Sequence, residues 1–102
     1  MEELLKMLED QKCWEFFEVF GGKGVEIRFK ILHKLLEKRE PVYIEELAVE
    51  IGIARTGLGK HLKKMGNIIR REERGGKLYY KFNTDFLDDF KNLLKTARRF
   101  VE

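Results

Sequence analysis

Hydrophobic residues recur at three- and four-residue steps along most of the chain, which is the spacing of an amphipathic helix. Glycines or a proline separate the stretches with this spacing, and such residues end helices. Asn83 or Thr84 can cap the last stretch. The pattern predicts helices over residues 1–22, 25–36, 44–51, about 55–65 and 84–102.

The spacing changes between the fourth and fifth of these helices. Ile68–Arg71 and Lys77–Phe82 are rich in β-prone residues, and they flank Glu72–Gly76, which ends in a Gly-Gly pair. This arrangement predicts a β-hairpin with a Gly-Gly turn. The predicted fold is mainly α with a small β-hairpin. It forms one domain over residues 1–102, with an N-terminal helix over 1–22, a core over 24–83 and a C-terminal helix over 84–102.

Two of the predicted helices are short and follow each other closely. Residues 44–51 and 55–65 are joined by Gly52-Ile53-Ala54, which is typical of a helix-turn-helix. A basic hairpin directly after it makes the unit a winged helix-turn-helix. Tyr43 and Ala54 precede the two helices and are poor caps, and the missing cap at Ala54 costs about 1 kcal/mol.

Positive charge is concentrated in one part of the chain. The net charge is only +3, but residues 54–81 hold nine Lys/Arg against two Asp/Glu, while residues 1–53 hold eight against twelve. A solvated surface is the simpler explanation of such a cluster. A surface that neutralises nucleic-acid phosphates is the sharper one, and we expect it for residues 54–81.

Other features of the composition exclude several classes of protein. No apolar run approaches the roughly 18 residues that span a bilayer, and the acidic N-terminus is unlike a secretion signal, so we expect no membrane partner and a cytoplasmic location. The chain has no serine, no Cys–His nucleophile arrangement and no phosphate-binding glycine motif, so we do not expect an enzyme. The many charges, with one glutamine and three asparagines, favour a thermophilic source.

The helix-turn-helix segment carries a resemblance to a known family. Residues Glu46–Met65 hold Glu-Leu-Ala, a glycine turn and a late His-Leu, and they resemble the helix-turn-helix of the ArsR-type (arsenic-repressor-like) winged-helix regulators of bacteria and archaea. Arg28–Leu32 and Lys77–Asn83 are similar to the flanking helix and strand of that family, and the match runs in register over residues 16–83. The resemblance implies a homodimer, paired through its first and last helices, that binds double-stranded DNA and regulates transcription.

The resemblance also implies roles for individual residues. Residues in the first turns of the 55–65 helix would lie in the major groove and contact base edges: Arg55, Thr56, Gly59 and Lys60. Arg55 suits guanine best, since a guanidinium can bond O6 and N7 together. Cations further along would contact phosphates: Lys63, Lys64, Arg70 and Arg71. In the wing, residues 68–82, Arg74 at the tip and Lys77 behind it would reach the backbone or the minor groove.

Two departures from the family pattern leave alternatives open. Gly57 and Gly59 lie inside the predicted recognition helix, and each costs about 1 kcal/mol relative to alanine. They either let the helix backbone approach DNA closely or mark a helix whose DNA-binding role has weakened. In the second case the chain would be a winged-helix module that docks on a protein of the transcription machinery, and Trp14–Phe20 would be its essential surface.

Metal sensing is common in the resembled family, but the residues for it are absent. The stretch Ile44–Ile51, where the family places a cysteine pair, has no cysteine. Cys13, His33 and His61 are scattered over three predicted elements with no ligand spacing. We therefore expect no metal and no other cofactor.

Overall fold

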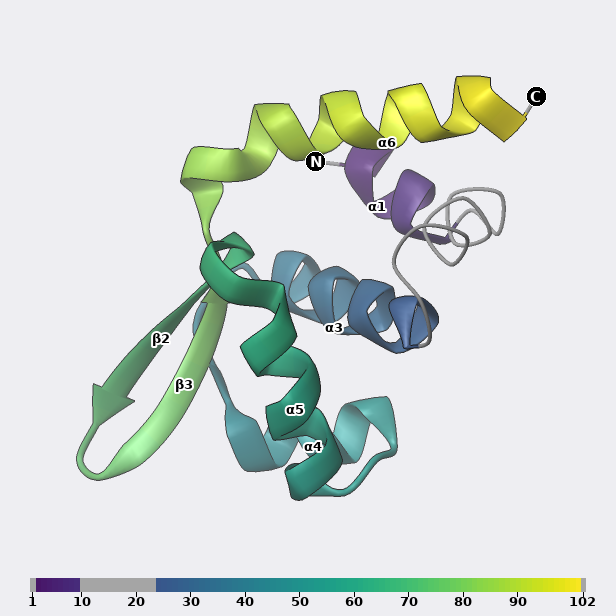
Figure 1. The fold of residues 1–102 in the computed structure, drawn as a ribbon. Helices are drawn as coiled ribbons and strands as arrows, with labels where there is room; N and C mark the ends of the chain where they lie inside the picture. The colour runs from purple at the N-terminus through teal and green to yellow at the C-terminus, as the bar shows by residue number, and fades with distance from the viewer. Residues whose placement is uncertain (1, 10–23, 102) are drawn as a thin grey trace.

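The polypeptide folds into five α-helices, two 3-10 turns and three short strands in the part of the chain that the structure describes, residues 2–9 and 24–101 of a computed structural model (Figure 1). In chain order these are α1 (Glu2–Glu9), α3 (Val25–Lys38), β1 (Val42–Tyr43), α4 (Ile44–Ile51), α5 (Arg55–Met65), β2 (Ile69–Arg74), β3 (Lys77–Phe82) and α6 (Leu87–Val101), with 3-10 turns η1 (Gly66–Ile68) and η2 (Thr84–Phe86). The fold is mainly helical with a small three-stranded antiparallel sheet, which confirms the coarse prediction.

Helix α3 forms the centre of the hydrophobic core. Ile31 is fully buried and Leu35 is 2% exposed, and both lie on α3 between the other helices and the sheet. Leu47 of α4 and Leu58 of α5 are also fully buried. Helices α1 and α6 lie on the other side of α3 from α4 and α5 (Figure 1), and Leu94 of α6 is fully buried there.

The sheet has one buried face and one face that no described element buries. Its strand order is β1-β3-β2, and Val42 pairs with Tyr80 while Ile69 pairs with Phe82. These four residues share a face, because directly opposed residues point to the same side, and all four are buried. We call this side the inner sheet face and the opposite side the outer sheet face.

Strand β1 was not predicted from the sequence. It consists only of Val42 and Tyr43, which is too short to show an alternation of apolar and polar residues, and α4 follows it directly. The hairpin was predicted with a Gly-Gly turn, which is confirmed, although β2 runs further towards the turn than expected. Pairing extends to Arg74 and Lys77, so that only Gly75 and Gly76 turn the chain, with φ of 55° and 77°. Positive φ at both positions suits glycine.

Asn83 joins the end of β3 to the segments on either side of it. Its Nδ2 donates to the carbonyl of Asn67 (2.9 Å), and its Oδ1 accepts from the backbone N–H of Asp85 (3.1 Å). The prediction that Asn83 caps a helix is confirmed for η2, while α6 itself begins later than expected, at Leu87. The side chain therefore fixes the angle at which the chain leaves the sheet towards α6.

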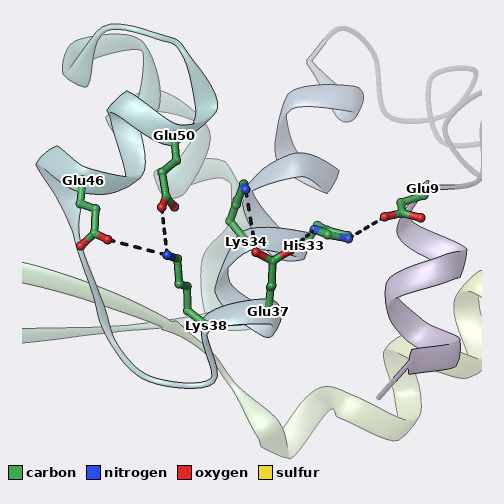
Figure 2. Close-up of polar contacts among 7 residues, drawn as sticks. All are labelled: Glu9, His33, Lys34, Glu37, Lys38, Glu46 and Glu50. Atoms are coloured by element: carbon green, nitrogen blue, oxygen red, sulfur yellow. Dashed lines mark hydrogen bonds and ion pairs between the residues drawn. The ribbon is translucent and has the colours of Figure 1, made fainter.

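Polar contacts join α1 and α4 to the central helix (Figure 2). On one side His33 of α3 lies 2.9 Å from Glu9 of α1 and 3.6 Å from Glu37. On the other side Lys38 lies 3.0 Å from Glu50 and 3.9 Å from Glu46, both on α4. The hydrogen bond from Lys38 to Glu50, with the charge of that carboxylate, raises the pKa of Lys38. These contacts show that carboxylates gather along α1, α3 and α4.

The N-terminal prediction is tested only in part. Residues 2–9 form α1, as expected, but the rest of the predicted helix over 1–22, with Cys13 and the Trp14–Phe20 group, lies outside the described residues. Among residues 2–9 and 24–101, none of the helices is both long and apolar enough to cross a membrane.

We expect Asn83→Ala to lower the free energy of unfolding by about 1–3 kcal/mol, because it leaves the carbonyl of Asn67 and the N–H of Asp85 without their partner. Urea unfolding followed by circular dichroism measures the change. Asn92→Ala, at an exposed position of α6, is the control, and it should alter the free energy of unfolding by less than about 0.5 kcal/mol. Equal effects of the two substitutions would contradict the joining role.

Candidate functional site

Helix α5 presents a cationic side to solvent. Leu58, Leu62 and Met65 face the core, as the sequence predicts. The predicted contact residues on the other side of the helix are all exposed except Gly59, which is half-buried: Arg55, Thr56, Lys60, Lys63 and Lys64. The orientation of α5 is set by the turn before it, where Gly52 has a φ of 82° and its N–H and that of Ile53 both donate to the carbonyl of Ala48.

Neither α4 nor α5 has a side-chain cap. Tyr43 and Ala54 occupy the N-cap positions in extended conformations, and neither side chain bonds to the backbone of its helix. The N–H groups of the first turn of α5 are therefore not satisfied by a capping side chain. The structure agrees with the sequence prediction at both positions.

Gly57 and Gly59 are not required by the fold. Their φ angles are not positive, and a Cβ added at either residue would meet no neighbouring atom within 4 Å. At Gly52, in contrast, the backbone is left-handed, a conformation that favours glycine. Each glycine lowers the stability of α5, and neither makes room for a neighbouring side chain of the fold. We therefore look for their role in a molecule that binds to the helix.

A groove of about 540 Å³ separates α5 from the inner sheet face. Gly59 and Lys63 line its helix side, and Arg71 of β2 and Tyr80 of β3 line its sheet side. Three predicted contact residues, Gly59, Lys63 and Arg71, are thus brought to one concave surface. We call it the α5–β2 groove.

The other predicted hairpin residues lie on the outer sheet face. Adjacent strand residues point to opposite sides, so Arg70 and Arg71 cannot both face the groove. Arg70 bonds to Asp85 (2.6 Å) and Arg74 bonds to Glu72 (2.7 Å), while the Lys77 ammonium lies 5.3 Å from the centre of the Tyr43 ring. The single surface expected for all the cations of residues 54–81 is therefore divided in two by the sheet.

Arg55, the predicted guanine contact, is held by a carboxylate that the sequence analysis did not single out. Its Nη1 lies 2.9 Å from Oε1 of Glu45, in the first turn of α4. Both side chains remain about half exposed, at 56% and 46%. Arg55 and Glu45 are ten positions apart on different helices, so only the packing of α4 against α5 brings them together.

His61 lies on the side of α5 that faces α3. Its Nδ1 is 3.3 Å from Nη1 of Arg28, and a Cβ at Gly24 would lie 2.7 Å from its Cε1. Burial, followed by the charges of Arg28 and Lys64, lowers the pKa of His61. The described residues contain no group of three or more His, Cys, Asp or Glu side chains that could hold a metal ion.

We expect alanine at Gly59 to raise the free energy of unfolding by about 1 kcal/mol, since the added methyl meets no atom and alanine is the better helix former. Alanine at Gly52 is the matched comparison. It should lower stability by about 1 kcal/mol or more, because φ there is positive. Thermal unfolding of both variants measures the effects, and a destabilised Gly59→Ala would show that the fold itself requires this glycine.

The chain should lose stability on mild acidification because of His61. A lowered folded-state pKa means that the unfolded chain binds the proton first, so the contribution of His61 is present above the ordinary value of 6.5 and is lost as the pH falls through and below it. In His61→Gln the pH dependence of unfolding in urea should be weaker than in the parent. His33→Gln, on the α1 side of α3, controls for the second histidine. An unchanged pH dependence in His61→Gln would contradict the role of burial and Arg28.

Comparisons with known proteins find structures with a similar fold but give no function. No protein-family model matches the sequence, and no curated protein is detectably similar in sequence. The structure is similar to the crystal structure of RV1404 from Mycobacterium tuberculosis, with a TM-score of 0.62 and 15% identity. The similarity covers 88% of this chain and 63% of that one. The structure is also similar to that of M. tuberculosis Rv0081, with a TM-score of 0.57 and 22% identity over 85% of this chain and 82% of that one. At these identities the likeness concerns the fold alone.

Proposed function

We propose that the chain is a homodimeric regulator of transcription that binds double-stranded DNA through a winged helix-turn-helix of the ArsR-like type. In this proposal α4 and α5 are the helix-turn-helix and the β2–β3 hairpin is the wing. The observation that carries it is the α5–β2 groove, where Lys63 and Arg71 approach from two elements beside an exposed cationic helix.

The charge distribution supports docking of a polyanion on the α5 side. Lys60, Lys63 and Lys64 are exposed along α5, and Arg71 lies across the groove from Lys63. The carboxylates of Figure 2 lie instead on α1, α3 and α4. A phosphate backbone is therefore attracted to one side of the molecule, and each phosphate neutralised releases condensed counterions.

Base recognition falls to the first turns of α5 in this proposal. Arg55 and Thr56 stand at the N-terminal end of the helix, where recognition helices contact base edges. The half-exposed Glu45 holds the guanidinium of Arg55 in place, which reduces the freedom that Arg55 loses on binding guanine. The same carboxylate repels phosphates, so it favours base contact over unspecific contact.

Apolar surface near the chain ends supports a homodimer. Leu93 of α6 is 45% exposed and Phe86 is 37% exposed, both large for solvent-facing positions. Helix α6 packs on α1, and a second copy placed against this pair would cover the exposed residues. A two-fold axis there would set two recognition helices about 34 Å apart, one turn of B-DNA.

A protein-docking module is the second candidate, and two observations favour it. Gly57 and Gly59 leave α5 short of side chains where nothing in the fold would contact them, and Val49 of α4 is 81% exposed. In this case the chain would bind a component of the transcription machinery with Trp14–Phe20 as the essential residues, and neutral variants of the α5 cations would bind that partner normally.

The test is selection of bound duplex fragments from the source genome, followed by fluorescence anisotropy of a selected site against salt. We expect a palindrome with half-sites one helical turn apart. Lys63→Gln and Arg71→Gln should each reduce the salt slope by about one. Lys30→Gln, at an exposed position of α3, is the matched control and should leave the slope unchanged.

Arg55→Ala should cost about 1–3 kcal/mol of preference for the selected site over other duplexes. Glu45→Gln should strengthen unspecific binding while weakening that preference. Absence of any salt-sensitive binding to duplex DNA would overturn the regulator proposal and leave the protein-docking module.

A further inference from the structure

The outer sheet face is a second surface with its own chemistry. Strand register places seven residues on it, and none of them is buried: Tyr43, Arg70, Glu72, Arg74, Lys77, Tyr79 and Lys81. The hairpin projects away from the helices in Figure 1. The buried residues of the same strands all point to the inner sheet face, so this side is open along its length.

Two tyrosines lie side by side in the middle of this face. The ring centres of Tyr43 and Tyr79 are 5.6 Å apart with the rings tilted by 41°. The guanidinium carbon of Arg74 lies 5.6 Å from the Tyr79 centroid, and the Lys77 ammonium 5.3 Å from that of Tyr43. A flexible cation that lies over an aromatic ring can move away and leave the ring face to a flat group such as a nucleobase.

Cations outnumber carboxylates on the outer face. Glu72 is the one acidic residue among the seven, and Lys81 (3.0 Å) and Arg74 (2.7 Å) both bond to it. The hydrogen bond from Lys81, with that from Arg74, lowers the pKa of Glu72. Two cations already converge there on an anionic oxygen pair, which is the arrangement that a phosphate needs.

The base of the face ends in a cavity of about 440 Å³. Arg39, Arg70 and Lys81 contribute positive charge to its lining and Thr84 a hydroxyl, while its one carboxylate, Asp85, bonds to Arg70. From the Arg74–Lys77 pair at the tip to the Arg70–Lys81 pair at the base the strands advance four residues, about 13 Å. A few nucleotides of an extended strand cover this distance.

A duplex in the α5–β2 groove cannot use these groups, because the sheet separates the two surfaces. Base-paired nucleotides also keep their flat faces stacked inside the helix. Unpaired bases expose them, and stacking on aromatic side chains is worth about 1–3 kcal/mol per base. Cations spaced along two tyrosines therefore match a single strand better than a duplex.

We infer that the outer sheet face binds single-stranded nucleic acid. Bases stack on Tyr43 and Tyr79 in place of Lys77 and Arg74, which turn to the phosphates, and Arg39 and Lys81 hold the strand at the base of the hairpin. The site does not depend on duplex binding by α5. A chain with both sites holds a duplex and an unpaired strand, such as a transcript or melted DNA, on opposite sides of one hairpin.

The test measures anisotropy of labelled DNA and RNA single strands of about 12 nucleotides, with a hairpin duplex as the third probe, at low salt. Arg39→Gln combined with Lys81→Gln should weaken single-strand binding about tenfold and leave duplex binding within about twofold. Lys63→Gln combined with Arg71→Gln should do the reverse. The DNA and RNA arms show which strand is preferred.

Two further variants separate stacking from charge. Tyr79→Leu should weaken single-strand binding about tenfold, with thermal unfolding checking that the variant is folded. Glu72→Gln should strengthen it, whereas Glu73→Gln, the neighbouring carboxylate on the inner sheet face, should not.

No single-strand binding by the parent chain would overturn the inference, whatever the duplex probe shows. Equal losses in the groove variants and the outer-face variants would overturn it as well, because one surface would then bind both probes. Loss of duplex binding alone, with single-strand binding intact, would count against the regulator proposal and not against this site.

Discussion

The packing of α3 against α4, α5 and the inner sheet face determines which side chains reach solvent. Ile31 and Leu35 of α3, with Leu47 and Leu58 from the two short helices, are almost completely removed from water. Because those positions must point inward, the cations of α5 must point outward, and alternate residues of β2 must leave the core. The candidate site is a consequence of this burial, since no local feature of α5 fixes its orientation except the Gly52 turn.

Much of the fold could be predicted because its signals are local. Helical spacing predicted α4 and α5 with the bounds that the structure has, Gly75-Gly76 predicted the hairpin, and Asn83 was one of the two predicted caps. Strand β1 was missed because it is two residues long and exists only through pairing with β3. The predicted start of the C-terminal helix at residue 84 was wrong for a similar reason. Asn83, which bonds to the distant carbonyl of Asn67, is followed by the 3-10 turn η2, and α6 begins only at Leu87.

The candidate site was predicted as a set of cations, and sequence alone could not divide that set. Charge counting treats Arg70 and Arg71 as equivalent neighbours, whereas a strand sends them to opposite faces. Glu45 was not found because it belongs to an acidic helix far from the basic segment in sequence. Pairing across elements depends on helix packing, which neither spacing nor composition records.

The two-residue turn has a consequence for how the hairpin can change during evolution. It keeps β2 and β3 paired up to their last residues, so every cation on the hairpin owes its side of the sheet to the register. A residue inserted within β2 would move each later side chain of that strand to the other side, carrying Arg71 out of the groove and Arg70 or Glu72 into it. Homologous chains should therefore tolerate length changes in the loop at the tip and select against them within the strands, since neither surface can be altered by a shift without altering the other.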